Sequence, residues 1–467
     1  MPAISIATLD GSPTDIGEAE IAAFRGRFQG EVLEPSHLDY EEVRQVWNGN
    51  IDRRPALIAR CTSAADVQAA VSLAREHNLL VAVRGGAHNA AGHGTCDGGI
   101  VIDTSPMKTI SVDPEQRTAR AEPGLTWAEF DAATLEHGLA TTGGTVTNTG
   151  IAGLTLGGGL GWLMGKHGLT IDNLLACEIV TADGSLVRAS SDENTDLFWA
   201  LRGGGGNFGV VTAFEYQLHP VADLVLGGLV IHPLEKGKEL LQFMQEFVQD
   251  LPDEALAAAV LLTAPDDGPR VAAMLLGYTG DLDEGERVLA PARNWGEPID
   301  DTIGRIPYAE RQALIDDPNA IIGLQRYWKS GFTTNLSDDL IDVAVEAAAN
   351  FPSPLTALLF FRIHGAATRV PESETAFGMR REQWDCNIIS QWEDPAENEA
   401  QIAWTREVWA RIEPTISGSA YVNHLASDDS VEKVRASYGT NIDRLMQIKA
   451  QYDPTNLFRL NPNIPPA

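Results

Sequence analysis

The residues best suited to chemistry gather between positions 81 and 96, where the chain reads VAVRGGAHNAAGHGTC. Gly85 and Gly86 end an apolar, strand-like run, and glycine allows positive φ angles or a close approach of main chain to a ligand. His88 follows at once, so the main chain holds its imidazole in place, as a nucleophile or a ligand requires. We therefore expect a strand that ends in a ligand-sized loop, with His88 as the anchor of a cofactor.

Two other interpretations of His88 stay open at this point. It can be an ordinary loop histidine with satisfied hydrogen bonds, or it can ligate a metal together with His93 and Cys96. The metal site is the weaker interpretation, because no second pair of closely spaced ligands completes the set. We expect no metal ion.

A second glycine-rich stretch, residues 150–173, reads GIAGLTLGGGLGWLMGKHGLTIDN. It is too rich in glycine for the interior of an ordinary helix or strand, so we expect main chain that passes close to a ligand. Main-chain amides in such loops form concavities that bind anions, and a pyrophosphate fits this chemistry.

One GxGxxG pattern occurs, at Gly204, Gly206 and Gly209. A helix-like run precedes it and a strand-like run follows, whereas the dinucleotide fingerprint of a Rossmann unit needs a strand first and a helix second. We therefore do not expect a nicotinamide dinucleotide domain, and we interpret the motif as a glycine turn packed against a flat ring system.

The elements that must position these loops form an α+β module. A strand over 56–61, an N-cap at Thr62-Ser63, a helix over 66–77 and a strand over 79–84 deliver the His88 loop. After this loop come three short strand-like runs, at 99–104, 109–113 and 118–124, and then a helix at 126–138. The glycine-rich stretch follows the helix.

Chain length and net charge limit the functions that the protein can have. The 467 residues exceed one ordinary core and indicate two or three domains at about 100–200 residues each. The net charge of −31 opposes binding to nucleic acid and to anionic membranes, which favours a small-molecule substrate. The excess of acidic residues is typical of a halophilic protein, in which salt screens self-repulsion. An arginine-rich acidic protein from an ordinary high-GC genome is the alternative.

The N-terminus lacks a basic region followed by an apolar one, and no window holds about 18 uninterrupted apolar residues. We expect a soluble, cytoplasmic protein, and a homodimer stays open. The four cysteines lie far apart without CxxC pairing, which predicts reduced thiols rather than a disulfide framework.

Six sequence motifs together indicate a known family, and they occur in the order RGGAHN, DGGIVID, EPGLTW, GLTLGGGLGWLMGKHGLTIDN, DLFWALRGGGGNFGVVT and YDPTNLFRLNPNI. Over roughly residues 40–467 the chain resembles the FAD-linked oxidases of the berberine bridge enzyme-like group, which share the FAD-binding fold of vanillyl-alcohol oxidase. The resemblance implies an α+β, two-part FAD-binding domain of the PCMH type, at residues 1–217 (core 55–221) and 417–467. Strand-like runs alternating with acidic helical segments over 218–416 predict an inserted antiparallel-sheet substrate domain covered by helices.

In this group the histidine of the RGGGH-type motif is joined to the flavin 8α-methyl group, and that position is His88 here, after an Ala87 in place of a common glycine. Val146 stands where many members have a second, cysteinyl link. The resemblance therefore implies one histidyl linkage and no cysteinyl linkage, as in members similar to 6-hydroxynicotine oxidase. It also implies FAD contacts for Arg84, Gly85, Gly86, Ala87, Asn89, His93, Gly94, Thr149, Gly150, Gly153, Leu154, Gly158, Gly161, Trp162, Gly209, Val210, Val211, Asn423, Asn461 and Asn463.

The candidate acid–base residues lie in the later part of the chain. In the strand-like run 385–392 the period of two places Asp385 and Asn387 on one face. Asn387 stands where plant members have a glutamate or glutamine, and it cannot accept a proton, so Asp385 is the acidic candidate or a plain solvated sheet residue. Tyr421 and His424 match a YxNY segment with histidine as the last residue, and both are candidate bases or hydrogen-bond partners of the flavin.

The resemblance implies an FAD-dependent oxidase or dehydrogenase that oxidises a C–H bond beside a hydroxyl or amine, in an alcohol, a sugar or an amine, by hydride transfer to flavin N5. Thr149 falls at the position that gates oxygen in the group, and its valine-like size favours O₂ as acceptor, with H₂O₂ as product. A dehydrogenase with another acceptor, or a flavin-carrying binding protein, is the alternative. Lys329 lies in a KS motif of the group and is expected either to be structural or to line the pocket.

Overall fold

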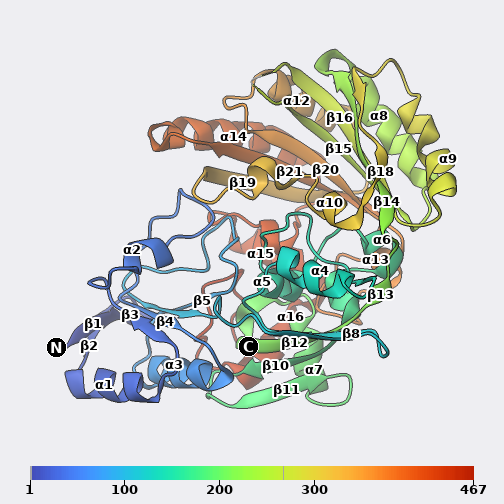
Figure 1. Cartoon of the computed structure of the whole chain (residues 1–467). Coiled ribbons are helices and arrows are strands. Elements are labelled where there is room, and N and C mark those ends of the chain that lie inside the picture. Colours follow the sequence, from blue (N-terminus) through green and yellow to red (C-terminus); the bar gives the residue numbers. More distant parts are fainter. Residues whose placement is uncertain (1–2, 267) are drawn as a thin grey trace.

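The computed structural model describes residues 3–266 and 268–467, and its chain forms two bodies (Figure 1). Both ends of the chain lie in the lower body of Figure 1, and a large sheet with its helices forms the upper one. Helices and strands both contribute throughout, which confirms the expected α+β class. Among the described residues, no helix has the length and apolar character needed to cross a membrane.

The first sheet of the lower body delivers the His88 loop. Its strand order is β3 (Glu31–Leu33), β4 (Leu57–Arg60), β6 (Ile100–Asp103) and β5 (Val81–Arg84), with β4, β6 and β5 parallel. Helix α3 (Ala64–Glu76) joins β4 to β5, and the Ser63 side chain caps it by accepting a hydrogen bond from the Asp66 main-chain N–H. The predicted strand-helix-strand unit is confirmed. A hairpin and a short helix precede it: β1 (Ile4–Ala7), β2 (Pro13–Ile16) and α1 (Glu18–Arg27).

The second sheet of the lower body is antiparallel throughout. Its order is β11 (Leu186–Ser190), β10 (Leu174–Val180), β12 (Val210–Gln217), β8 (Thr118–Ala121) and β7 (Ile110–Asp113). Helix α4 (Trp127–Leu135) begins with a capping box of Thr126 and Glu129. Helix α7 (Thr195–Leu201) precedes the GxGxxG turn and β12 follows it, which confirms the order predicted against a Rossmann unit.

The glycine-rich stretch after Gly150 corrects the sequence prediction. It begins with a helix, α5 (Ile151–Gly157), where we expected irregular main chain. Ile151, Thr155 and Leu156 are buried on one side, and this packing outweighs the low helix propensity of glycine. The helix ends where Gly158 takes a φ of 132°, a value that side-chain-bearing residues rarely adopt.

The upper body is built on an eight-stranded antiparallel sheet. The main strand order is β17 (Asp300–Asp301), β14 (Leu224–Pro233), β16 (Arg270–Tyr278), β15 (Ala255–Thr263), β20 (Ala357–Ile363), β21 (Gln383–Trp392) and β19 (Gln325–Thr333), with β18 (Gly304–Pro307) beside β14. Four helices pack their apolar sides on one face of this sheet, namely α8 (Gly237–Phe247), α9 (Leu282–Arg293), α12 (Asp338–Ala349) and α14 (Asn398–Ile412). The predicted antiparallel sheet covered by helices is confirmed.

The other face of this sheet is turned toward the lower body. Along β15, Ala257 and Ala259 pack in the core beneath the helices, whereas Leu256 and Ala258 pack in the core shared with the lower body. This alternation follows from the two-residue period of a strand. The sheet therefore presents one complete face to the site.

The C-terminal segment returns to the lower body. After α15 (Val431–Tyr438) and α16 (Ile442–Tyr452), the Ile464 main-chain N–H donates to Asn207, and the buried Lys449 ammonium donates to the Asn207 and Phe458 carbonyls. These contacts join the last residues to the GxGxxG turn. The domain limits at 217 and 416 stay predictions.

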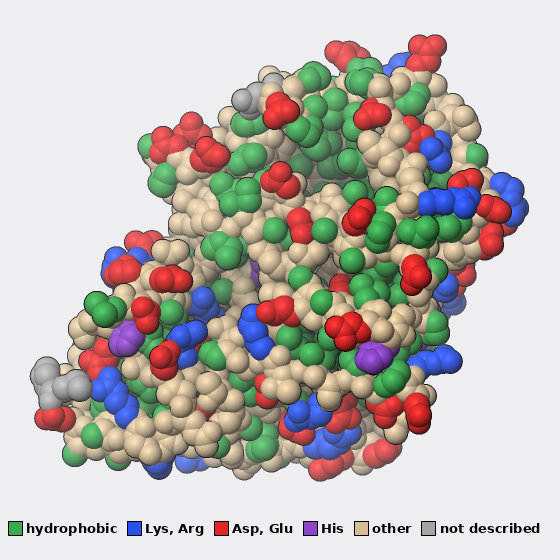
Figure 2. Space-filling model, viewed as in Figure 1, with side chains coloured by type: hydrophobic (Ala, Val, Ile, Leu, Met, Phe, Trp, Pro, Cys, Tyr) green, Lys and Arg blue, Asp and Glu red, His purple; other side chains and the backbone are tan. Residues whose placement is uncertain are grey.

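The acidic excess is spread over the surface. On the face shown in Figure 2, acidic side chains lie all around the outline and basic ones lie singly or in small groups between them. This face offers no continuous basic area to a nucleic acid.

Candidate active site

A cavity of about 300 Å³ lies between the free face of the large sheet and the glycine loops of the lower body. One end, which we call the main-chain end, is lined by the His88 loop, the start of α5, the GxGxxG turn and residues 458–462. The other, the sheet end, is lined by side chains of β16, β19, β20 and β21. Residues 421–424 lie on the wall between them.

Glycines shape the main-chain end in two different ways. A Cβ added to Gly86 would lie 2.5 Å from Gly150 main-chain atoms, so the two loops cross where neither tolerates a side chain. A Cβ added to Gly153 or Gly206 would meet no protein atom within 4 Å, although both glycines line the cavity. The first pair therefore serves protein packing, and the second pair leaves room that a flat cofactor can fill.

Unsatisfied polar atoms in this region also fit a bound cofactor. The Asn461 side chain donates to the Phe458 carbonyl, which leaves its buried Oδ1 without a partner at the cavity wall. Buried acceptors are normally hydrogen-bonded, so a ligand that brings hydroxyl or amino donors suits this position. The residues present therefore fit a nucleotide cofactor such as FAD.

Most of the predicted cofactor residues meet at the cavity. Those that line it are Arg84, Gly85, Gly86, Ala87, His88, Asn89, His93, Gly94, Thr149, Gly150, Gly153, Leu154, Gly209, Val211, Asn423 and Asn461. Five others do not line it, and their part in cofactor binding stays a prediction; they are Gly158, Gly161, Trp162, Val210 and Asn463. Of these, Trp162 and Val210 are buried in apolar cores.

His88 is held on two sides. Its Nε2 lies 2.9 Å from Asn148 Oδ1, and its ring stacks on Trp47 with centroids 4.1 Å apart. Burial lowers its pKa to about 3, so the imidazole is neutral near pH 7. Ala87 takes a φ of 54°, in the left-handed region that favours glycine.

The alternative metal site gains no support. His93 lines the cavity, but Cys96 is buried in a small apolar core with Leu33 and Tyr40. Over residues 3–266 and 268–467, no three His, Cys, Asp or Glu side chains are grouped as a metal ion requires.

The sheet end is built by strand register. Leu275, Ala258, Phe361 and Asp385 are paired in one row across β16, β15, β20 and β21, and Leu359 is paired with Asn387 in a neighbouring row. Directly paired residues of antiparallel strands project from the same face. The wall is therefore apolar, with two polar residues at its β21 side, as the period of two predicted for Asp385 and Asn387.

Asp385 and His424 form a hydrogen-bonded pair at that wall. His424 Nδ1 lies 3.0 Å from Asp385 Oδ2, and Asp385 is only 1% exposed. A carboxylate at this distance accepts the Nδ1–H, which leaves the lone pair on Nε2. The Asn387 side chain donates to the Asp385 carbonyl, so its amide is also oriented locally. Asp385 is therefore a buried partner of an imidazole and not a solvated sheet residue.

Tyr421 is more constrained than His424. Its phenol oxygen accepts hydrogen bonds from the Gly159 main-chain N–H at 2.8 Å and from Asn423 Nδ2 at 2.7 Å. Burial raises its pKa to about 12, so it stays protonated at neutral pH. Its ring meets the His424 imidazole edge-on at 4.8 Å. Tyr421 therefore shapes the wall and contacts the imidazole.

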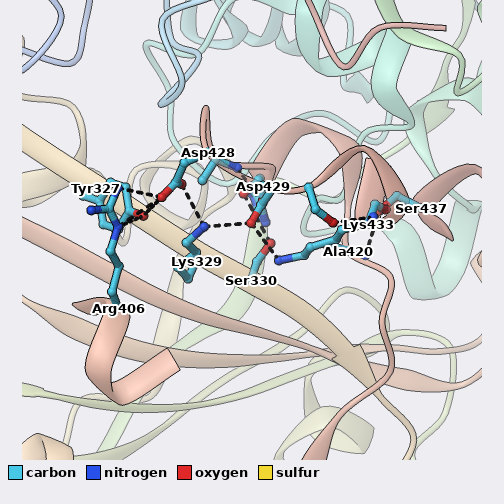
Figure 3. Close-up of polar contacts among 12 residues, drawn as sticks. Tyr327, Lys329, Ser330, Arg406, Ala420, Asp428, Asp429, Lys433 and Ser437 are labelled. Carbon is cyan, nitrogen blue, oxygen red and sulfur yellow. Dashed lines mark hydrogen bonds and ion pairs between the residues drawn. The ribbon is translucent and has the colours of Figure 1, made fainter. Parts of the chain in front are cut away.

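An ion cluster fixes the segment that follows His424 (Figure 3). Lys329 on β19 donates to Asp428 and to Asp429 at 2.8 Å each, and Tyr327 on the same strand donates to Asp428 at 2.6 Å. The Lys329 side chain is buried and does not line the cavity. Of the two predictions for Lys329, the structural one is therefore confirmed. On the opposite face of β19, Trp328 meets the His424 ring edge-on at 5.1 Å.

Sequence reasoning missed several residues of the site. Trp47 lies in a stretch without a periodic signal, Asn148 lies between Val146 and Thr149 without a motif of its own, and Trp328 precedes Lys329 in a motif defined by the lysine and the following serine. Ile315 also lines the cavity from the inserted region. The strand pattern of residues 325–333 was the one signal available for Trp328.

Comparison with known protein families covers the main-chain end of the cavity and the wall that carries Tyr421 and His424. Residues 55–190 match the FAD binding domain family, and residues 420–465 match the family described as berberine and berberine like. The first range includes the His88 loop and α5, and the second includes Tyr421 and His424.

Full-length relatives also match. An FAD-linked oxidoreductase from Dictyostelium discoideum is 32% identical over 443 residues, covering 94% of this chain and 95% of that protein. The (R)-6-hydroxynicotine oxidase of Paenarthrobacter nicotinovorans is 32% identical over 454 residues, covering 94% and 97%. A crystal structure of 6-hydroxy-D-nicotine oxidase from Arthrobacter nicotinovorans matches with a TM-score of 0.86 at 30% identity and covers 94% of this chain and 98% of that one.

Proposed function

The chain belongs to the berberine bridge enzyme-like family of FAD-linked oxidoreductases and is an FAD-dependent enzyme, and on this premise we propose that it oxidises a C–H bond beside a hydroxyl or amine of a small molecule. The observation that carries the proposal is the Asp385–His424 pair, which lies on the cavity wall between the main-chain end and the apolar sheet end. Bound FAD supplies the acceptor for the hydride.

His424 is the base in this proposal. Because Asp385 accepts its Nδ1–H, Nε2 has the lone pair that takes the proton from the substrate hydroxyl or amine. Asp385 then stabilises the imidazolium that forms, as the carboxylate of a catalytic triad does. Tyr421 remains protonated and holds its place through Gly159 and Asn423, so it shapes the wall beside the base.

The sheet end selects the substrate. Leu275, Leu359, Phe361 and Trp328 offer apolar contact area, and Asn387 offers one amide beside the base. Such a wall suits a compact organic molecule with few polar groups. The solved relative named for 6-hydroxynicotine supports a substrate of this kind.

We propose one covalent linkage, between His88 and the flavin 8α-methyl group. His88 lines the cavity, whereas Val146 occupies the position of a second, cysteinyl link and can form none. In this proposal FAD is held by residues 1–217 and 417–467, and residues 218–416 bind the substrate. We further propose O₂ as the electron acceptor, with Thr149 at the cavity wall as the residue that governs its access.

Anaerobic mixing with a panel of alcohols, sugars and amines tests the activity. Loss of the oxidised flavin absorbance with at least one compound is expected, followed by its return and by H₂O₂ formation on admitting air. The His424→Phe variant is the control, and it should retain flavin but bleach far more slowly. A protein that chemical reductants bleach and no member of the panel bleaches would be a flavin-carrying binding protein. Bleaching without reoxidation by air would indicate a dehydrogenase.

A further inference from the structure

We propose that Asn148 is a positioning residue for cofactor attachment, which holds the His88 imidazole with its proton on Nε2 and its lone pair on Nδ1. The inference also assigns a part in attachment to the inserted region, through residues 315–324, which we call the crossing segment. It rests on the proposed linkage at His88 and goes beyond it by naming the residues that hold the imidazole for attachment.

The orientation of the Asn148 amide is fixed by its own partners. Its Nδ2 donates to the Ala320 carbonyl at 2.6 Å, and a carbonyl oxygen can only accept. Its Oδ1 must therefore face His88 Nε2, which lies 2.9 Å away. An amide oxygen can only accept as well, so Nε2 carries the hydrogen and Nδ1 the lone pair.

The same contact turns the reactive nitrogen toward the cavity. His88 lines the cavity and Asn148 does not, so the nitrogen bonded to Asn148 points away from it. The imidazole is neutral because burial lowers its pKa, so its reactivity depends on which nitrogen carries the proton. Because Asn148 binds the proton on Nε2, Nδ1 is the nitrogen that attacks.

The crossing segment accepts hydrogen bonds from both residues that contact the His88 imidazole, Trp47 and Asn148. Trp47 stacks on the His88 ring and donates its indole N–H to the Asn319 carbonyl at 2.7 Å, and the next carbonyl, that of Ala320, holds Asn148. The Arg326 guanidinium also lies over Trp47, 3.7 Å from its ring centroid. Two consecutive carbonyls of the inserted region thus set the ring plane and the proton position of a histidine in the lower body.

Attachment is a two-electron oxidation, and molecular oxygen is its oxidant. A bond forms between His88 Nδ1 and the 8α carbon, and one C–H bond of the methyl group breaks and gives up its hydrogen as a proton. The two electrons of that bond pass into the ring system until O₂ takes them together with two protons, the one lost by the methyl group and one from solvent, and H₂O₂ leaves. The imidazole keeps its Nε2 proton, hydrogen-bonded to Asn148, and the alkylated ring becomes an imidazolium.

The test compares Asn148→Ala with Thr147→Val in apoprotein from riboflavin-limited cells. Thr147 is a matched control, because its hydroxyl binds Asp316 of the same crossing segment but does not touch His88. After FAD is added, the covalent fraction is followed by flavin fluorescence in denaturing gels. Asn148→Ala should slow attachment roughly tenfold, the effect of a lost buried hydrogen bond, and Thr147→Val should match the wild type.

Two further measurements have their main readout in the wild-type protein. The ¹⁵N shifts of labelled histidine in the apoprotein, assigned with His88→Gln, should show His88 protonated on Nε2, and Asn148→Ala should mix the two tautomers. NMR of the wild-type flavin peptide should show linkage through Nδ1. Linkage through Nε2, or wild-type kinetics in Asn148→Ala, would overturn the inference. Flavin absent from the His88 peptide would instead refute the proposed linkage.

Discussion

The two ends of the cavity are built by opposite means. At the main-chain end the space exists because side chains are missing, at Gly153 and Gly206, while Gly86 and Gly150 let two loops cross. At the sheet end the wall consists of side chains from four strands, brought into rows by register. The first construction suits a cofactor common to a family, and the second suits a substrate that differs between its members. Four predictions, from the largest expected effect to the smallest, test this division and the contact between the two bodies.

The largest effect is expected at the wall between the two ends. His424→Phe removes the proposed base and should lower the rate of flavin reduction by roughly 10²–10⁴, the range for a positioned general base. Tyr421→Phe should lower it less, because the tyrosine is not the proton acceptor in our proposal. Stopped-flow mixing without oxygen measures the rate of flavin reduction in both variants, and the amount of flavin bound to each variant is the control. Equal rates in the two variants would remove the base role from His424.

The second effect concerns the contact between the two bodies. Asp131 on α4 accepts a hydrogen bond from Gln312 on α10 (Tyr308–Gln312), and burial raises its pKa from 3.8 to about 7. The folded protein therefore binds a proton that the unfolded chain releases near pH 4. Its free energy of unfolding should fall between pH 4 and 7 by about 4 kcal/mol from this group alone. Asp131→Asn should flatten that decline, measured by urea unfolding at several pH values. An unchanged slope would contradict the assignment.

The third effect separates the two kinds of glycine. Gly86→Ala places a Cβ 2.5 Å from Gly150 and should destabilise the protein by roughly 1–3 kcal/mol, as overpacking does. Gly153→Ala meets no protein atom and adds a better helix former to α5, so the fold should keep its stability. Flavin content should drop in Gly153→Ala nonetheless, since its methyl group occupies cofactor space. Melting curves and bound flavin per protein distinguish the two, and equal melting temperatures would refute the division.

The smallest effect lies at the oxygen gate. Thr149→Leu enlarges a side chain at the cavity wall and should slow reoxidation of photoreduced enzyme roughly tenfold, a change of about 1.4 kcal/mol in the barrier. The rate of reduction by substrate serves as the control and should change little. A slow wild type, or a variant as fast as the wild type, would reject the gate.

Local sequence signals predicted a large part of this fold. The N-cap at Ser63, the strand that ends before Gly85, the helix predicted over 126–138 and the alternation along β21 each depend on neighbours in the chain. Where local and tertiary effects compete, as in α5, the sequence misled, because buried packing at Ile151 and Leu156 outweighs glycine propensity.

The sequence by itself determined the family, the positions of the glycine loops and the choice of His88 as the candidate anchor of the cofactor, because these depend on short motifs whose geometry is local. Only the tertiary structure decided which groups act on one another. The Asp385–His424 pair joins residues 39 positions apart, and Asn148 meets His88 from 60 positions away while it is held by Ala320 in the other body. Proton positions on both histidines follow from these contacts, and no local pattern encodes them, since a hydrogen bond depends on where two distant segments meet in space.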